Sequence, residues 1–285
     1  MKADTKKALK NKIPRRLWRA LVGFYRKLLW IKYKTAMLFG AKKMPLYCPC
    51  CGMKFKRFTE SVDYKGYTDF YDVTLFGKHR QDILCPVCGS LPRHRILASW
   101  CEANKGLLTS KDVLYFAPER GMTTWLKKNR ISFKTADLFD PFTDLKLDIQ
   151  DTGLADASYD AVICNHVLEH VGDYMAALKE VRRILRPDGI FICSFPMSPD
   201  VDMVLEDPDV KTDEERLRRY GQSDHVRLFG MNADKFMRDA GFDVTVISGD
   251  DYPAEIVPVT GPCDYDINRL FLCRKKGLKI WLTDH

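Results

Sequence analysis

The chain has 285 residues, of which 46% are apolar, so it can bury a full hydrophobic core and hold more than one domain. Its net charge of +8 is concentrated at one end: residues 1–46 contain 14 lysines and arginines against one acid, and the remainder carries a net charge of −5. This basic segment excludes a signal peptide and a membrane span, because Arg or Lys interrupts its apolar runs. An anionic surface is therefore the expected partner of this end.

An amphipathic helix that starts at Leu17 is the first predicted element. Most of its basic residues lie opposite its apolar face, with Lys32 as the exception, and such a helix suits an acidic membrane interface. We predict a basic segment over residues 1–44 that contacts an anionic membrane through residues 14–44. The alternatives are a helix packed on the protein's own core and an arm that binds nucleic acid, the less favoured partner. The apolar face consists of Leu17, Leu21, Phe24, Leu28 and Ile31, widened by Trp18, Val22, Tyr25 and Leu29.

The ten cysteines, in a sequence that shows no export signal, favour a reducing, cytoplasmic location, with peripheral contact to the inner membrane face through the basic helix. Disulfides are therefore not expected. Two C-x-x-C turns, each followed by a glycine, aim four thiolates at one point, which favours structural Zn²⁺. Their predicted ligands are Cys48, Cys51, Cys85 and Cys88.

These turns predict a small zinc-ribbon-like module over residues 45–92. A redox dithiol and unrelated buried thiols are the alternatives. Cys50 lies between the first two ligands and could replace one of them. Stabilising the junction with the next domain is the favoured role, because the module has no basic run of its own.

Beyond Leu91 the pattern alternates between apolar strands and amphipathic helices, which indicates an α/β sandwich with a mainly parallel sheet. A helix over 172–189 should end in the turn Arg186–Gly189, and a later helix over 231–241 has Asn232 as its cap candidate. Strands are predicted at 112–118, 133–138, 145–149, 159–167, 189–196, 243–249 and 269–276, after a first helix over 91–106.

The stretch from Tyr159 to Pro196, "YDAVICNHVLEHV…ALKEVRRILRPDGIFICSFP", resembles the core of class I S-adenosylmethionine-dependent methyltransferases of the type 11 kind. The resemblance runs from about Asp112 to Arg274. It implies a Rossmann-like three-layer sandwich, here a methyltransferase domain over residues 93–285 with an insertion at 198–222. The whole chain then reads as a basic helix, a zinc-binding module and this domain.

The resemblance implies that the cofactor's methionine part meets the turn after strand 112–118. The usual Gly-x-Gly is absent there, although the small Ala117 still allows close approach and Glu119 could accept the cofactor's α-ammonium. We expect an altered turn that still binds; a degenerate, non-binding turn is the alternative. The cofactor-binding residues predicted in this turn are Phe116, Ala117, Pro118, Glu119 and Gly121.

Two further acids match the family's pattern. Asp137, with Leu138 beside it, matches the position that holds the ribose hydroxyls, and Asp148, with Ile149, matches the adenine position. The chain between Asp137 and strand 145–149 is too short for a crossover helix, so a loop is expected. Both acids could instead only cap turns.

Asn165 and His166 close strand 159–167 at its carboxyl end, where ligands bind in open α/β sheets, and either could touch the cofactor. Glu169 and His170, in the "VLEHV" stretch, are interpreted first as packing and turn residues.

On the acceptor side, His225 is predicted as the catalytic base and Asp224 as the carboxylate that orients it. The insertion at 198–222 is predicted to cover the site. The expected reaction is methyl transfer to an oxygen or nitrogen of a small polar acceptor, preferably a sugar or glycan intermediate near the membrane. An RNA or protein methyltransferase and a non-catalytic zinc-containing scaffold are the alternatives.

Overall fold

The computed structural model describes residues 14–40, 44–59, 72, 83–257 and 269–276. The remaining residues, including most of the loop between the two cysteine pairs and the first 13 residues of the predicted basic segment, lie outside the described part.

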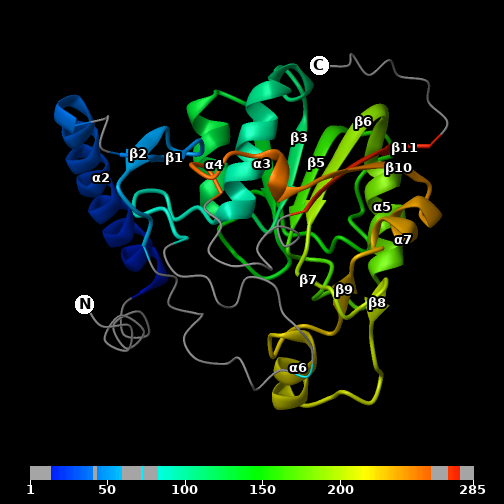
Figure 1. Ribbon diagram of the computed structural model, residues 1–285. Coiled ribbons are helices and arrows are strands. Elements are labelled where there is room, and N and C mark those ends of the chain that lie inside the picture. Colours follow the sequence, from blue (N-terminus) through cyan, green and yellow to red (C-terminus); the bar gives the residue numbers. More distant parts are fainter. Residues whose placement is uncertain (1–13, 41–43, 60–71, 73–82, 258–268, 277–285) are drawn as a thin grey trace.

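A six-stranded sheet forms the centre of the molecule, in the order β10-β11-β6-β5-β3-β4 (Figure 1). The strands β6, β5, β3 and β4 are parallel, whereas β11 runs antiparallel to both of its neighbours. The Rossmann-like α/β fold that the sequence predicts is therefore confirmed. The strands are β3 (Val113–Phe116), β4 (Phe133–Ala136), β5 (Tyr159–Asn165), β6 (Leu185–Ser194), β10 (Phe242–Ile247) and β11 (Leu270–Lys275).

Helices cover both faces of this sheet, so its central strands are apolar on both sides (Figure 1). Successive residues of β3 alternate between the two cores: Val113 and Tyr115 face one, and Leu114 and Phe116 face the other. The first face is covered by α3 (Pro92–Ala103), with a short 3₁₀ turn after it, and by α4 (Arg120–Lys128). The opposite face is covered by α5 (Tyr174–Ile184) and α7 (Asp234–Asp239).

Three local predictions need correction. The predicted strand at 145–149 is reduced to two isolated bridges, a parallel one between Leu145 and Ala136 of the main sheet and a local antiparallel one between Asp148 and Asp151. The turn expected at Arg186–Gly189 is instead the first half of β6, because α5 ends at Ile184. The side chain of Asn232 donates to Asp202, and Ala233 occupies the cap position of α7.

The described residues of the cysteine module share one core with the following domain. Its hairpin of β1 (Leu46–Cys48) and β2 (Met53–Phe55) buries Phe55 in the same core as α3, α4 and β3. The helix α2 (Arg15–Gly40) lies along this hairpin and packs on it through Leu29, Tyr33 and Met37 (Figure 1). The predicted amphipathic helix therefore exists, and one of its faces packs against the rest of the protein.

A small second sheet and a helix lie at the carboxyl edge of the main sheet (Figure 1). The sheet has the order β7-β9-β8, and the helix is closed by a Thr212–Glu215 capping box and a left-handed Gly221. Most of these elements belong to the predicted insertion. They are β7 (Met197–Ser198), β8 (Val204–Leu205), α6 (Asp213–Tyr220) and β9 (Leu228–Gly230).

Candidate active site and cysteine cluster

The strand order reverses between β3 and β5. The chain runs from β3 outward to β4 and then returns to the other side of β3 as β5. In open α/β sheets ligands bind outside the carboxyl ends of the strands at such a point. At this point β3 ends with Phe116, which pairs with Cys164 of β5. The chain of β5 continues from Cys164 into Asn165 and His166.

The turn after β3 keeps the backbone conformation of a glycine turn without its glycine. Ala117 has φ 44°, in the left-handed region that an L-residue adopts at a cost of about 1 kcal/mol, and its amide donates to Ala136 O at 2.8 Å. The buried Tyr115 hydroxyl, which the sequence analysis did not single out, accepts the amide of Glu119 at 3.2 Å. A Cβ at Gly121 would lie 3.0 Å from the His94 ring, so this glycine serves the close packing of α4 on α3.

Glu119 presents one carboxylate oxygen without a partner. Its Oε1 lies 2.6 Å from the Arg93 guanidinium and 2.7 Å from His94 Nε2, whereas its buried Oε2 has no hydrogen bond among the described residues. Burial alone would raise the pKa of Glu119, but Arg93 and His94 lower it overall, well below its usual range. This ionised oxygen suits an ammonium group, so the residues present fit the predicted cofactor.

Asp137 and Asp148 both cap turns. Asp137 Oδ1 accepts the amides of Phe139 and Asp140 at 2.7 Å each, and Asp148 Oδ1 accepts the amide of Gln150 at 2.9 Å. Capping does not exclude the ribose and adenine roles, which stay predictions. Leu138 is partly exposed beside Asp137, Ile149 is buried beside Asp148, and Pro118 is half-buried in the first turn.

Asn165 and His166 lie between the predicted cofactor and acceptor sides. The buried Asn165 side chain accepts the Ser194 hydroxyl at 2.9 Å. His166, also left-handed with φ 54°, places Nδ1 3.3 Å from Glu169 Oε1. Burial lowers the pKa of His166, and the charge of Arg93 adds to this effect.

Among the described residues, the Asp224 carboxylate pairs with His170 and not with His225, the predicted base. His225 is buried, with Nδ1 2.9 Å from Tyr220 O, whereas Asp224 places its carboxylate 3.5 Å from His170 Nδ1. The rings of His170 and His225 meet edge to face at 4.7 Å. The structure therefore adds His170 to the acceptor side.

Glu169, like His170, was interpreted from the sequence as a packing and turn residue. Its side chain is fully buried, and neither carboxylate oxygen has a hydrogen bond among the described residues. Burial alone would raise its pKa, but His166, with His225 and His170, lowers it. The available signal was a Glu–His pair directly behind a strand end.

Arg227 fastens the insertion to this turn. It is completely buried, and its guanidinium donates to the carbonyls of Leu168, Val171 and Gly172 and pairs with Glu206. The segment that carries His225 is thereby held against the residues that carry Glu169 and His170.

The four predicted zinc ligands come together. One sulfur from each of Cys48, Cys51, Cys85 and Cys88 lies within 4.8 Å of the others, at 3.6 Å for Cys48–Cys88 and 3.8 Å for Cys51–Cys85. Zn–S bonds of about 2.3 Å place tetrahedral sulfurs about 3.8 Å apart, so this arrangement fits Zn²⁺. Cys50 is not one of these four, and its thiol donates to His94 O at 3.3 Å.

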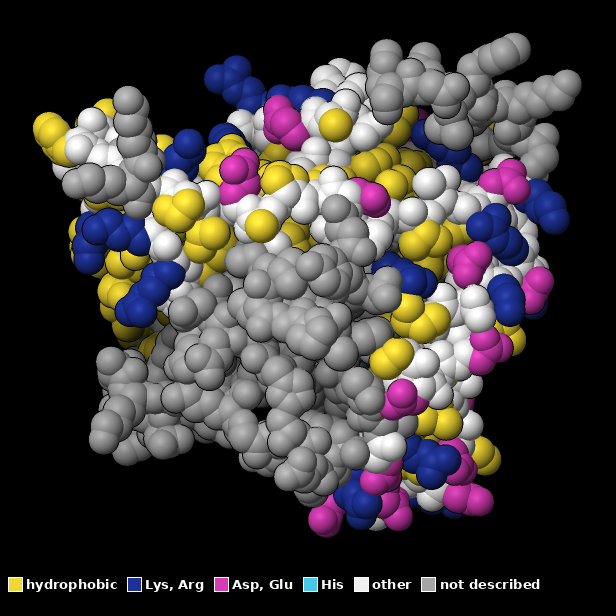
Figure 2. All heavy atoms as spheres, viewed as in Figure 1, with side chains coloured by type: hydrophobic (Ala, Val, Ile, Leu, Met, Phe, Trp, Pro, Cys, Tyr) yellow, Lys and Arg dark blue, Asp and Glu magenta, His cyan; other side chains and the backbone are white. Residues whose placement is uncertain are grey.

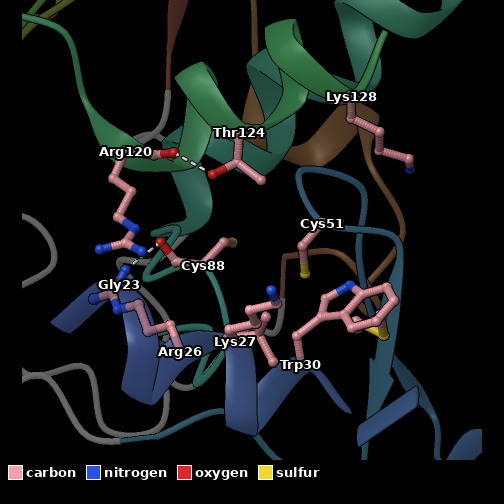
Figure 3. Close-up of a pocket in the computed structure, with 11 residues that line it drawn as sticks. Gly23, Arg26, Lys27, Trp30, Cys51, Cys88, Arg120, Thr124 and Lys128 are labelled. Carbon is pink, nitrogen blue, oxygen red and sulfur yellow. Dashed lines mark hydrogen bonds between the residues drawn. The ribbon is translucent and has the colours of Figure 1, made fainter. Parts of the chain in front are cut away.

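Basic side chains surround this cluster. A cavity of about 410 Å³ lies between α2, the cysteine turns and α4, and Arg26 donates across it to Cys88 O at 2.7 Å (Figure 3). Four thiolates would carry more negative charge than one Zn²⁺ neutralises, and these cations would offset the remainder if zinc is bound. The basic residues that line the cavity are Arg26, Lys27, Arg120 and Lys128.

The outer face of α2 is apolar and exposed. Hydrophobic side chains lie along this helix together with Lys and Arg (Figure 2). Within the described ranges, no helix has both the length and the apolar character that a membrane span requires. The exposed residues of this face are Leu17, Leu21, Phe24, Tyr25, Leu28, Ile31, Leu38 and Phe39, whereas Trp30 lines the cavity beside the cysteine turns.

Residues 96–193 match the model of a family described as a methyltransferase domain. No curated protein matches the chain. Three similar solved structures are a methyltransferase of Thermotoga maritima described as a possible histamine N-methyltransferase, the 1,6-didemethyltoxoflavin-N1-methyltransferase of Burkholderia thailandensis, and an S-adenosylmethionine-dependent methyltransferase of Mesorhizobium loti.

The first is 20% identical, with 65% of this chain and 92% of that chain covered and a TM-score of 0.41. The second is 16% identical, with 64% of this chain and 78% of that chain covered and a TM-score of 0.41. The third is 15% identical, with 62% of this chain and 95% of that chain covered and a TM-score of 0.44.

Proposed function

We propose that the chain is an S-adenosylmethionine-dependent methyltransferase that methylates an oxygen or nitrogen of a small polar acceptor, since residues 96–193 match the model of a methyltransferase domain. A sugar or glycan intermediate is the favoured acceptor class. The observation that carries the cofactor part of this proposal is the unpartnered, ionised Oε2 of Glu119 in a left-handed turn at the switch point of the sheet.

We assign the α-ammonium to Glu119, the ribose hydroxyls to Asp137 and the adenine to Asp148 and Ile149. When bound, the cofactor supplies a methyl group on a sulfonium, an electrophile that a lone pair of the acceptor attacks in line. The protein's part is mainly to position donor and acceptor. We propose that Asn165 and His166, at the carboxyl end of β5, border the reacting groups.

A hydroxyl acceptor must also lose its proton. His225 is the predicted base, and His170, whose side chain is 33% exposed, packs against it with Asp224 beside it. His170 belongs to the turn that follows β5, and His225 and Asp224 lie beside it. The acceptor is therefore expected between these three residues and the cofactor. We propose that the insertion, whose Glu206 pairs with Arg227, covers this side.

We further propose that the exposed face of α2 contacts an anionic membrane surface from the cytoplasmic side. Its apolar residues are flanked by the exposed basic residues Arg16, Lys27, Lys32 and Lys34. A lipid-linked glycan would be delivered to the active site by such contact. This arrangement supports the choice of acceptor class and leaves the acceptor's identity open to screening.

Calorimetric titration with S-adenosylmethionine and its demethylated product tests the cofactor site. Wild-type protein should bind both, and Asp137→Ala and Glu119→Gln should each bind at least about 10-fold more weakly. Asp156→Asn, which removes an exposed carboxylate on the far side of α5, is the matched control and should bind normally. Absence of binding to folded wild-type protein would exclude the methyltransferase proposal in favour of a scaffold.

A further inference from the structure

Three side chains converge beside the predicted acceptor position. One ligand atom from each of Glu169, His170 and His225 lies within 4.8 Å of the other two, and His170 Nε2 is 4.0 Å from Glu169 Oε1. Glu169 is completely buried, and its two oxygens lack hydrogen bonds among the described residues. Glu169 Oε1 lies 3.3 Å from His166 Nδ1, whereas Oε2 has no such contact among the described residues. A buried carboxylate that is satisfied at only one oxygen is costly, so a counter-charge is expected at this place.

The tautomers of the two histidines agree with a cation there. His225 Nδ1 lies 2.9 Å from Tyr220 O, and His170 Nδ1 lies 3.1 Å from Asp224 O. Because a carbonyl oxygen only accepts, each Nδ1 carries the proton and each Nε2 of a neutral ring presents a lone pair. Metal-binding histidines usually donate their other N–H to such a backbone carbonyl.

The contact of Gln222 supports the same tautomer for His225. The amide nitrogen of Gln222 lies 2.8 Å from His225 Nε2, where it donates to the ring's lone pair. Gln222 is exposed, so its side chain can rotate away and leave this nitrogen free for an ion. Carboxylate and imidazole lone pairs then face one another with no proton between them.

We propose that Glu169, His170 and His225 bind a divalent transition-metal ion with coordination positions open to the acceptor. Two imidazoles and one carboxylate form a ligand set that suits Mn²⁺, Fe²⁺ or Co²⁺, in contrast to the soft thiolates of the cysteine cluster. The site lies beside His166, which separates it from Glu119 on the cofactor side.

The role of the ion rests on the proposed methyltransferase function. A divalent ion favours loss of the proton from a hydroxyl that it binds, and two open positions suit neighbouring hydroxyls such as those of a sugar. The acceptor's O–H bond breaks, and its proton passes to the exposed Asp224 carboxylate or to water. The oxygen's electron pair then forms the bond to the methyl carbon, while the carbon–sulfur pair stays on sulfur. On this view His225 holds the ion and does not act as the base.

Manganese titration followed by electron paramagnetic resonance tests the site directly. Mn²⁺ is chosen because thiolates bind it poorly, so the zinc-loaded cysteine cluster does not compete. The full chain should bind Mn²⁺, and His170→Ala and Glu169→Gln should each weaken binding about 10-fold or more. Asp156→Asn is again the control, with binding unchanged.

Circular dichroism of each variant shows whether the fold is kept, and the partly exposed His170 gives the variant that should fold normally. Equal Mn²⁺ binding by wild type, His170→Ala and Glu169→Gln, or none by wild type, would overturn the proposal. Calorimetry with S-adenosylmethionine separates the two ideas. Cofactor binding without Mn²⁺ binding would return His225 to the role of base, and Mn²⁺ binding without cofactor binding would leave a metal site of another function.

Discussion

Ala117 adopts, in the turn after β3, a backbone conformation that glycine usually provides. The residue is held at φ 44°, which glycine adopts freely and alanine does not. Ala117→Gly is expected to raise the free energy of unfolding by about 0.5–1 kcal/mol, because relieved strain exceeds the added entropy of the unfolded chain. Urea denaturation measures this change. Ala136→Gly, in the buried strand β4, is the matched control and should lower stability; a loss in both variants would show that Ala117 is not strained.

Glu119 gives stability a pH dependence that can be isolated. Its folded pKa lies below the unfolded value of about 4.3, so its stabilising effect is complete above that pH and is lost as the pH falls further. Glu119→Gln should therefore cost about 1–3 kcal/mol at pH 7, and the difference from wild type should shrink between about pH 5 and pH 3. Urea unfolding at several pH values measures it. A difference that stays constant over this range would mean that the carboxylate is not ionised by Arg93 and His94.

At the scale of elements, the sheet could be predicted wherever an apolar run and a turn signal coincide, as for β3, β5 and β11. The prediction failed at 145–149, where alternation is present but the chain is too short for a crossover helix, so that only Leu145 of this segment pairs with the main sheet. It also failed at Arg186–Gly189, because a Pro-Asp-Gly sequence indicates a turn and the pairing of Leu185 with Tyr159 outweighs it. Tertiary pairing of this kind leaves no local pattern.

The candidate site was predictable to the extent that it follows strand ends. Ala117, Asn165 and His166 come directly after β3 or at the end of β5, and topology brings them together. The cluster around Glu169 was missed, because its partner His225 follows a helix of the insertion and no periodicity connects them. Contacts between residues far apart in the sequence hold these segments together, among them those of Arg227 and the hydrogen bond from the amide of Val226 to Glu169 O.

The helix α2 has one packed face and one exposed apolar face, and the exposed face carries a prediction. The chain should co-sediment with anionic vesicles and much less with neutral ones. Phe24→Glu, at a residue that is 64% exposed, should weaken this binding about 10-fold without changing stability. Phe139→Glu, at an exposed aromatic far along the chain, is the control. Binding that depends steeply on salt and is indifferent to vesicles would favour a nucleic-acid arm instead.

For the molecule as a whole, the shared core connects metal and fold. Because the cysteine turns, α3, α4 and the first face of the sheet bury one continuous set of side chains, loss of zinc should destabilise the methyltransferase domain as well as the module. Cys85→Ser should lose zinc and lower the Tm by about 5–10 °C in a single transition. Cys50→Ala should keep its zinc, since Cys50 is not one of the four cysteines whose sulfurs lie within 4.8 Å of one another, and its thiol donates to His94 O. Metal analysis combined with thermal unfolding measures both effects. An unchanged Tm in zinc-free Cys85→Ser would show that the module folds independently of the sheet, and zinc loss from Cys50→Ala would make Cys50 a ligand.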